Sequence, residues 1–238
     1  TDYREYFQRQ GGAVLGVTID KYNYVSVNML SEFFEYKIRV SYSNAELVNN
    51  VGDIAHPSVR ETLKFKNING YLDIHIFADL PVRTGLGSSS SFTVGFLNAL
   101  YALDGKTISK QQLAEEAIYI EQQLIKENVG CQDQVHAAYG GLNIIEFDTS
   151  GISVKPVIIS KYKYEFFNDS LMVFYTGLTR HASEIVKEQI ENTRTRSKDN
   201  YLEKMHKMVY EAARIISDEK PEDMIKGLGE ILNESWTL

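Results

Sequence analysis

Apolar and polar residues alternate in the first third of the chain, a period of two that is typical of strands with one buried face. The alternation is clearest at residues 22–28 and 71–78. Apolar and β-branched residues also predict strands at 13–19 and 33–43, and residues 46–50 either extend or interrupt the second of these. Residues 1–10 are expected to form a short helix or a loop, which Gly11 and Gly12 end.

The middle of the chain changes to helical spacing. Leu113, Ala117, Ile120 and Leu124 fall at i, i+4, i+7 and i+11 behind Ser109, which is a good N-cap residue. Similar patterns predict helices at 57–66, 87–103, 131–139, 181–194, 201–217 and 222–233, and strands at 142–147, 153–159 and 171–175. Strands first, helices next and a mixed segment last favour an α+β protein with two lobes, divided near residues 161–168.

The strand at 71–78 and the helix at 87–103 are joined by a short turn that holds Gly85 and Gly87. Glycine reaches backbone dihedrals that other residues resist and lets the backbone approach a ligand closely. Four serines, residues 88–91, follow as good N-cap residues. Free first-turn amides and the positive end of the helix dipole favour an anion, so a polyphosphate is the natural ligand. A linker or a plain helix cap is the alternative, which the flanking strand and helix weaken.

Composition narrows the class of protein. Hydrophobic residues make up 43% of the chain and charged residues 24%, which is ordinary for a globular protein. A net charge of −7 without a basic run argues against a nucleic-acid-binding surface. We find no apolar run of about 18 residues and no signal-peptide pattern. The single Cys131 excludes an intramolecular disulfide and a multi-cysteine metal site, so a cytoplasmic location is expected.

The turn carries neither of two common phosphate-binding signatures. No lysine precedes the serines as in a P-loop, and Ser90 stands where a Gly-x-Gly-x-x-Gly loop has its third glycine. Residues 80–91, Leu-Pro-Val-Arg-Thr-Gly-Leu-Gly-Ser-Ser-Ser-Ser, instead resemble the nucleotide-phosphate loop of the GHMP kinases. This resemblance implies that the nucleotide is bound by Gly85, Leu86, Gly87, Ser88, Ser89 and Ser90.

Two carboxylates that follow the loop extend the resemblance. Glu121 lies beside the apolar stripe of its helix, and Asp133 ends a Gly-x-x-Asp segment that begins at Gly130. The family's pattern implies that Ser89 and Glu121 bind Mg²⁺ and that Asp133 contacts the acceptor hydroxyl and orients or deprotonates it. Taken alone, Glu121 has a solvated helix glutamate as its alternative, and Asp133 has a carboxylate favoured by a helix start. The joint order of the motifs favours the kinase interpretation.

Two further segments bear on the acceptor. Thr1-Asp2-Tyr3 is similar to the end of a sugar-kinase segment whose aspartate binds sugar hydroxyls, so Asp2 is predicted to bind substrate, with a frayed terminal acid as the alternative. Residues 175–183 resemble the sugar-phosphate branch of the family, above all the D-glycero-D-manno-heptose 7-phosphate kinases. In this segment Arg180 is predicted to bind a substrate phosphate, because a guanidinium matches phosphate geometry; a surface salt bridge is the alternative.

The resemblance implies the GHMP kinase fold. An ATP-binding domain like domain 2 of ribosomal protein S5 is expected at residues 1–163, and an incomplete ferredoxin-like domain at 164–238. The family's glycine-rich C-terminal motif and the beginning of its first motif do not occur in these 238 residues.

The implied reaction is transfer of the γ-phosphate of ATP to a sugar hydroxyl, most directly the 1-hydroxyl of D-glycero-D-manno-heptose 7-phosphate. ATP, Mg²⁺ and a small sugar are the expected ligands, without nucleic-acid or membrane partners, and a homodimer is left open. A kinase for galactose, fucose or a different sugar phosphate is one alternative. A nucleotide- or sugar-binding fragment without turnover is the other.

Overall fold

The computed structural model describes residues 1–81, 84–174 and 191–238. They divide into two compact units. The loop unit comprises the described part of residues 19–139 and holds the glycine-and-serine turn, and the terminal unit comprises residues 1–18, 140–174 and 191–238. Both units contain helices and strands, which confirms the predicted α+β class. The predicted domains at 1–163 and 164–238 stay a prediction.

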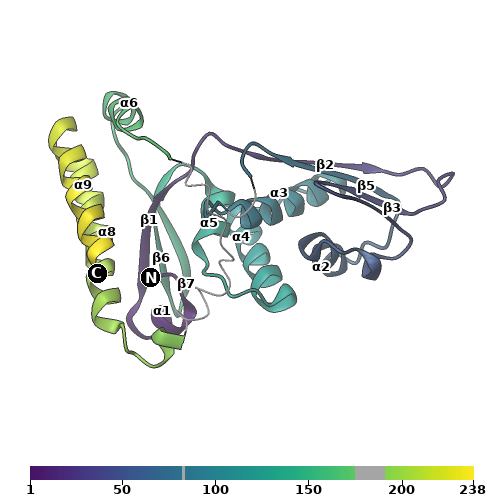
Figure 1. Cartoon of the computed structure of the whole chain (residues 1–238), viewed down its shortest axis with the longest axis horizontal. Coiled ribbons are helices and arrows are strands. Elements are labelled where there is room, and N and C mark those ends of the chain that lie inside the picture. Colours follow the sequence, from purple (N-terminus) through teal and green to yellow (C-terminus); the bar gives the residue numbers. More distant parts are fainter. Residues whose placement is uncertain (82–83, 175–190) are drawn as a thin grey trace. The chain divides into compact units, whose positions relative to one another are not determined.

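The loop unit is built on a four-stranded sheet of order β2-β5-β3-β4. Its strands are β2 (Asn23–Met29), β5 (Leu72–Ala78), β3 (Ile38–Ser41) and β4 (Ala45–Val48). Strands β3 and β5 run parallel, and the other neighbouring pairs are antiparallel. Alternation along β5 buries Leu72 and Ile74 on one face and directs Asp73 and His75 to the other. Figure 1 shows α2 (Pro57–Phe65) and α3 (Ser88–Leu103) along one side of this sheet.

Helix α3 is the central element of the loop unit. Phe92 and Phe96 stack at 5.6 Å between ring centroids and join the core under the sheet. Leu97 lies in a second cluster with residues of α4 (Lys110–Tyr119) and with Ile120, the first residue of the π-helical turn η2 (Ile120–Ile125). Ser109 caps α4 as predicted, because its side chain accepts a hydrogen bond from the Gln112 amide. Burial on both sides holds the N-terminus of α3 in a fixed place. The 3₁₀-helix η1 (Val51–Asp53) and α5 (Gln132–Tyr139) complete this unit.

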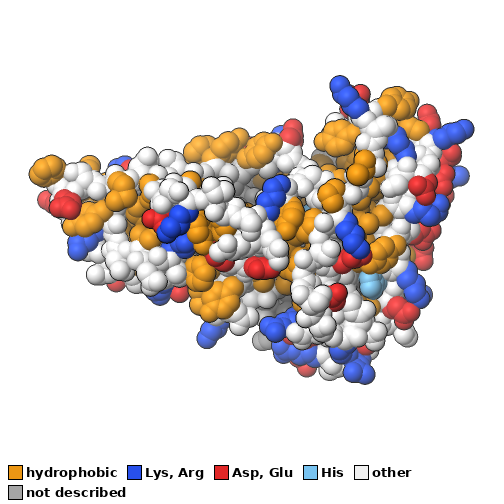
Figure 2. Space-filling model, turned by 180° about the vertical axis from the view of Figure 1, so that it is seen from behind, with side chains coloured by type: hydrophobic (Ala, Val, Ile, Leu, Met, Phe, Trp, Pro, Cys, Tyr) orange, Lys and Arg blue, Asp and Glu red, His pale blue; other side chains and the backbone are white. Residues whose placement is uncertain are grey.

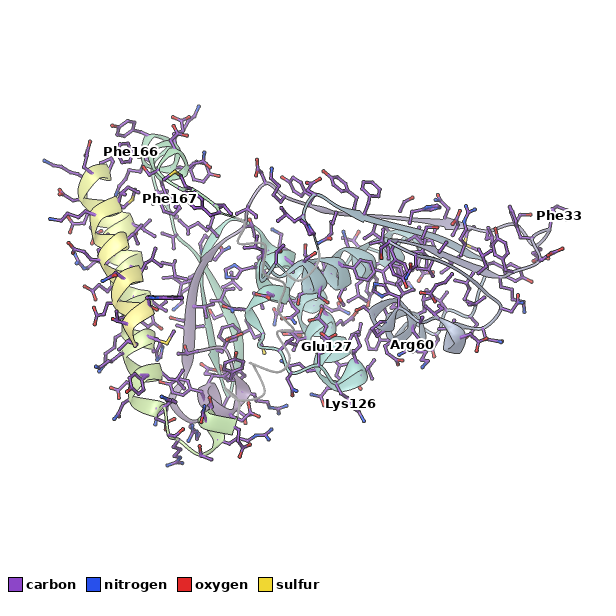
Figure 3. The ribbon with its side chains drawn as sticks, viewed as in Figure 1. Phe33, Arg60, Lys126, Glu127, Phe166 and Phe167 are labelled. Atoms are coloured by element: carbon purple, nitrogen blue, oxygen red, sulfur yellow. The ribbon has the colours of Figure 1, made fainter. Side chains whose placement is uncertain are left out.

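The terminal unit has an antiparallel sheet of order β1-β6-β7, formed by β1 (Gly12–Val17), β6 (Leu142–Asp148) and β7 (Gly151–Pro156). Its helices include α1 (Arg4–Gln10), α6 (Lys161–Asp169), α8 (Asp199–Asp218) and α9 (Pro221–Thr237). Ile215 of α8 and Met224 of α9 are buried together, and Phe166 and Phe167 of α6 pack against them (Figure 3).

Two sequence-based predictions about β3 and its neighbours are corrected by the structure. The predicted strand at 33–43 begins only at Ile38, because residues 31–37 turn and leave Phe33 99% exposed at the tip (Figure 3). Residues 46–50 neither extend nor merely interrupt it, since Ala45–Val48 is a separate strand that pairs with β3. Aromatic residues favour strands only where neighbouring groups pack against them, and Phe33 lacks such cover.

Differences also occur after β7. The stretch at 161–168, predicted as a connection, forms α6, whose N-cap Ser160 accepts a hydrogen bond from the Lys163 amide. Residues 171–174, predicted as the beginning of a strand, lie outside any strand in the described chain, with Met172 and Val173 each 79% exposed. The predicted helix at 181–194 lies outside the described residues up to residue 190.

Charges of both signs are mixed on one face of the molecule. Figure 2 shows lysine and arginine side chains interspersed with acidic ones on the face that it draws, with apolar groups between them. Among the helices of the described residues, none has the length and apolar character needed to cross a membrane.

The polar face of the loop-unit sheet gives a test of its pH dependence. The Arg39 guanidinium hydrogen-bonds the Asp73 carboxyl, with Nε and Oδ1 2.7 Å apart, and His75 lies 3.0 Å from the same oxygen. These contacts hold the pKa of Asp73 below its ordinary value. The carboxylate therefore stabilises the fold above the ordinary aspartate pKa of about 3.9, and this stabilisation is lost as the pH falls through the lowered pKa.

We predict that Asp73→Asn lowers the free energy of unfolding at about pH 7, and that its difference from the wild type narrows by about pH 3. Urea unfolding at both pH values measures this. Asp20→Asn is the control, because the Asp20 side chain is 87% exposed and should change little at either pH. A deficit of Asp73→Asn that is equal at both pH values would contradict the assignment.

Candidate active site

The turn between β5 and α3 leads the chain into the helix through two glycines. Gly85 and Gly87 have φ of +77° and +69°, in the left-handed region that glycine adopts without strain. The structure makes Gly87 the N-cap of α3 in place of the serines expected there, and no side chain caps the helix. The amides of the first turn are therefore not satisfied by a capping side chain, which suits the N-terminus for an anion.

The neighbouring strand β2 supports this turn. Asn23 Nδ2 donates to the Ser88 carbonyl oxygen at 3.1 Å, and Ser88 Oγ donates to Asn23 Oδ1 at 3.4 Å. A shallow hollow lies beside this contact, lined in part by Lys21, Tyr22, Leu80 and Leu86. The lining beside the glycine-and-serine turn is therefore part apolar, from leucines, and part polar.

Glu121 lies on η2, which continues α4 with wider, π-helical turns. The Glu127 amide donates to the Glu121 carbonyl oxygen at 2.9 Å, and Lys126 ends the turn with φ of +65°. Figure 3 labels Lys126 and Glu127 at this end. Single π-turns inside helices are frequent at functional sites, and this one carries Glu121 into the interior of the unit, where its exposure is 0%.

The buried Glu121 carboxylate is held from two other elements. Ser90 Oγ of α3 donates to Glu121 Oε2 at 2.8 Å, and Gln134 Nε2 of α5 donates to the same oxygen. Glu121 Oε1 is buried and has no hydrogen-bond partner. Burial raises the pKa of Glu121, while hydrogen bonds from Ser90 and Gln134 oppose this rise. One oxygen is thus held by two protein donors, and the other is buried without a hydrogen-bond partner.

The serine that contacts Glu121 is Ser90, one residue beyond the predicted metal ligand Ser89. Successive residues of an α-helix point about 100° apart, so Ser90 turns inward with 5% exposure while Ser89 is exposed at the helix mouth. The Ser89 backbone oxygen accepts from Thr93 Oγ1 at 3.2 Å. The role of Ser89 as a metal ligand stays a prediction.

Asp133 lies against the glycine-and-serine turn. A Cβ added to Gly87 would lie 3.2 Å from Asp133 Cγ and 3.3 Å from its Oδ2. A side chain at residue 87 would therefore crowd this carboxylate, which would have to shift by a few tenths of an ångström. The structure therefore brings the turn, Glu121 and Asp133 together within the loop unit, as the predicted arrangement requires.

The structure does not test the two other predicted substrate residues. Asp2 belongs to the terminal unit, where it is buried at 5% exposure. Its neighbour Thr1 exchanges two hydrogen bonds of 2.8 Å with the Ala13 backbone. Arg180 lies outside the described residues, as does Arg83 beside the loop. Substrate binding by Asp2 and Arg180 stays a prediction.

Sequence reasoning missed Gln134 and Asn23. Gln134 is fully buried on α5 next to the buried Val135, three residues after the buried Cys131. A polar residue on an apolar helix face needs a buried partner, which is the signal that could have identified it. Asn23 gave no comparable signal, because it begins an ordinary alternating strand.

The donor atoms suit a hard divalent cation. Mg²⁺ prefers oxygen ligands and keeps several waters, so one carboxylate, a hydroxyl and phosphate oxygens suffice. Glu121 Oε1, buried and unpartnered, supplies such a carboxylate oxygen. The described residues contain no cluster of three or more His, Cys, Asp or Glu side chains that could hold a metal without a ligand's help.

Comparisons with known proteins agree with this geometry. Residues 46–141, which include the turn, Glu121 and Asp133, match the family model of the GHMP kinases N terminal domain. The chain is 25% identical over 250 residues to the D-glycero-alpha-D-manno-heptose 7-phosphate kinase of Campylobacter jejuni, with 99% of this chain and 71% of that protein covered. It is 29% identical over 183 residues to the galactokinase of Pyrococcus furiosus, with 71% of this chain and 48% of that protein covered.

A solved structure gives the same result for the fold. The structure of a D-glycero-D-manno-heptose 1-phosphate kinase from Bacteroides thetaiotaomicron matches with a TM-score of 0.80 over 99% of this chain and 73% of that one, at 18% identity. A likeness at this identity concerns the fold alone. Residues 46–141 are therefore identified as a GHMP kinases N-terminal domain, and the comparisons support a phosphotransferase enzyme.

Proposed function

We propose that the chain acts as an ATP-dependent sugar kinase, most directly on the 1-hydroxyl of D-glycero-D-manno-heptose 7-phosphate. The observation that carries the proposal is that a buried carboxylate, Glu121, and an exposed one, Asp133, flank the same uncapped helix N-terminus. A kinase needs such a place to hold phosphates, a cation and an acceptor hydroxyl together. The heptose acceptor is inferred from the similarity to the Campylobacter kinase.

In this proposal, amides from Gly85 to Ser90 bind the phosphates of ATP, since first-turn amides and the helix dipole attract anions. The base and ribose are proposed to lie against the hollow beside Asn23, where Leu80 and Leu86 offer apolar contacts. Glu121 holds Mg²⁺ through Oε1, with Ser89 at the exposed helix mouth as the second protein ligand. When bound, the cation neutralises negative charge on the phosphates.

Asp133 acts on the acceptor in this proposal. Its carboxylate accepts the hydrogen bond of the sugar hydroxyl and takes the proton as the oxygen attacks the γ-phosphorus. The bond from the γ-phosphorus to the bridging oxygen breaks, and ADP leaves with that oxygen. Asp2 and Arg180 are proposed to bind the sugar hydroxyls and the substrate phosphate, respectively.

Two alternatives remain as outcomes of experiment. A kinase for galactose or fucose would consume ATP with an unphosphorylated sugar, and the similarity to the Pyrococcus galactokinase favours testing this first. A binding fragment would take Mg·ATP without forming product. A panel of sugars and sugar phosphates, with ATP consumption as the readout, separates these cases.

We predict that Asp133→Asn lowers phosphoryl transfer by about 100-fold or more, which is the usual contribution of a positioned acid or base. Binding of Mg·ATP should persist, because the amide is close in size to the carboxylate. Single-turnover transfer and calorimetric ATP binding measure the two effects. Asp104→Asn, at the opposite end of α3, is the control and should keep full activity. Undiminished turnover in Asp133→Asn would overturn the assignment.

We predict that Gly87→Ala abolishes most transfer, because its methyl group would push Asp133 away from the turn. Gly105→Ala is a matched control: Gly105 has the same φ of +69°, but a Cβ there meets nothing within 4 Å. Both variants should lose roughly 1–2 kcal/mol of stability through the left-handed backbone. Equal activity of the two variants would contradict the placement of Asp133 at the site.

A further inference from the structure

Gln134 forms a second buried polar group beside Glu121. Its side chain is fully buried on α5, and its Nε2 donates to Glu121 Oε2. Its Oε1 is also buried and has no hydrogen-bond partner. Two unpartnered acceptor oxygens, one from Glu121 and one from Gln134, are therefore enclosed in one region of the loop unit. Leaving such atoms unpaired costs free energy, so the arrangement calls for an explanation beyond packing.

The orientation of the Gln134 amide explains why Glu121 Oε1 is the oxygen without a partner. Ser90 and Gln134 both donate to Oε2, which leaves Oε1 as the carboxylate oxygen without a protein donor. A carboxylate that is held at one oxygen presents the other in a fixed direction. Residues that orient a metal ligand in this way commonly contribute 10- to 100-fold to metal affinity.

We propose that Gln134 is a positioning residue that holds the Glu121 carboxylate so that Oε1 faces a divalent cation. This inference rests on the proposed function, because it assigns Glu121 to the cation. Gln134 acts through its Nε2 donor and does not itself bind the metal. In this proposal η2 supplies the metal ligand Glu121, and Ser90 of α3 and Gln134 of α5 fix the direction of its carboxylate.

The test measures Mn²⁺ binding by electron paramagnetic resonance in the presence of a non-hydrolysable ATP analogue. Gln134→Met keeps the length of the side chain and removes the donor, and it should weaken Mn²⁺ binding by about 10-fold or more. Binding of the analogue without metal should stay unchanged. Gln123→Met is the control, since Gln123 is an exposed glutamine on η2. Thermal unfolding in EDTA checks that each variant is folded.

A second variant separates positioning from direct ligation. Gln134→Glu keeps the side-chain length and replaces the donor amide with a second oxygen, so Mn²⁺ binding should weaken; binding equal to or tighter than that of the wild type would indicate direct ligation and overturn the proposal. In a Glu121→Ala background, Gln134→Met should have no further effect on Mn²⁺ affinity.

The same variants separate failure of the Gln134 role from failure of the proposed kinase function. Mn²⁺ binding that Glu121→Ala weakens and Gln134→Met does not would overturn the role of Gln134 and leave the kinase assignment standing. Mn²⁺ binding that Glu121→Ala leaves unchanged would overturn the assignment of Glu121 to the cation in the proposed function, and with it the role of Gln134.

Discussion

The arrangement of the loop unit depends on one buried carboxylate. Glu121 has no exposed surface, yet it is ionisable, and isolated burial of a charge is costly. Hydrogen bonds from Ser90 and Gln134 offset this cost at one oxygen and leave the other unsatisfied. These hydrogen bonds form only when α3, η2 and α5 are all correctly packed against one another. The carboxylate therefore ties helix α3 to η2 and α5, which carry Glu121 and Asp133.

The same constraint explains the local backbone. The π-helical turn at Ile120–Ile125 rotates Glu121 inward, and the left-handed Lys126 ends that turn before the chain enters α5. Gly87 serves both the entry to α3 and the space that Asp133 needs. Packing of Phe92, Phe96 and Leu97 on two sides of α3 keeps these contacts in place. The uncapped N-terminus is thus held by a rigid core, and an anion there would meet groups that are already oriented.

Much of this could be predicted from the chain, and the exceptions have physical causes. The turn at Gly85 and Gly87 and the cap at Ser109 follow from local chemistry, so pattern reasoning found them. The inward turn of Ser90 in place of Ser89 depends on the phase of α3, which the serine run 88–91 hides because its members are identical. Gln134 was missed because its partner lies in another helix. The exposed Phe33 shows the opposite failure, since aromatic residues predicted a strand that packing does not support.

The central claim is that Glu121 Oε1 and the first turn of α3 share one bound Mg²⁺–nucleotide complex. A crystal structure of this chain with Mg²⁺ and a non-hydrolysable ATP analogue tests it most directly. The account predicts phosphate oxygens at the amides of residues 85–90 and the cation at about 2.1 Å from Glu121 Oε1. Phosphates bound elsewhere, or Glu121 still enclosed and distant from the cation, would contradict it.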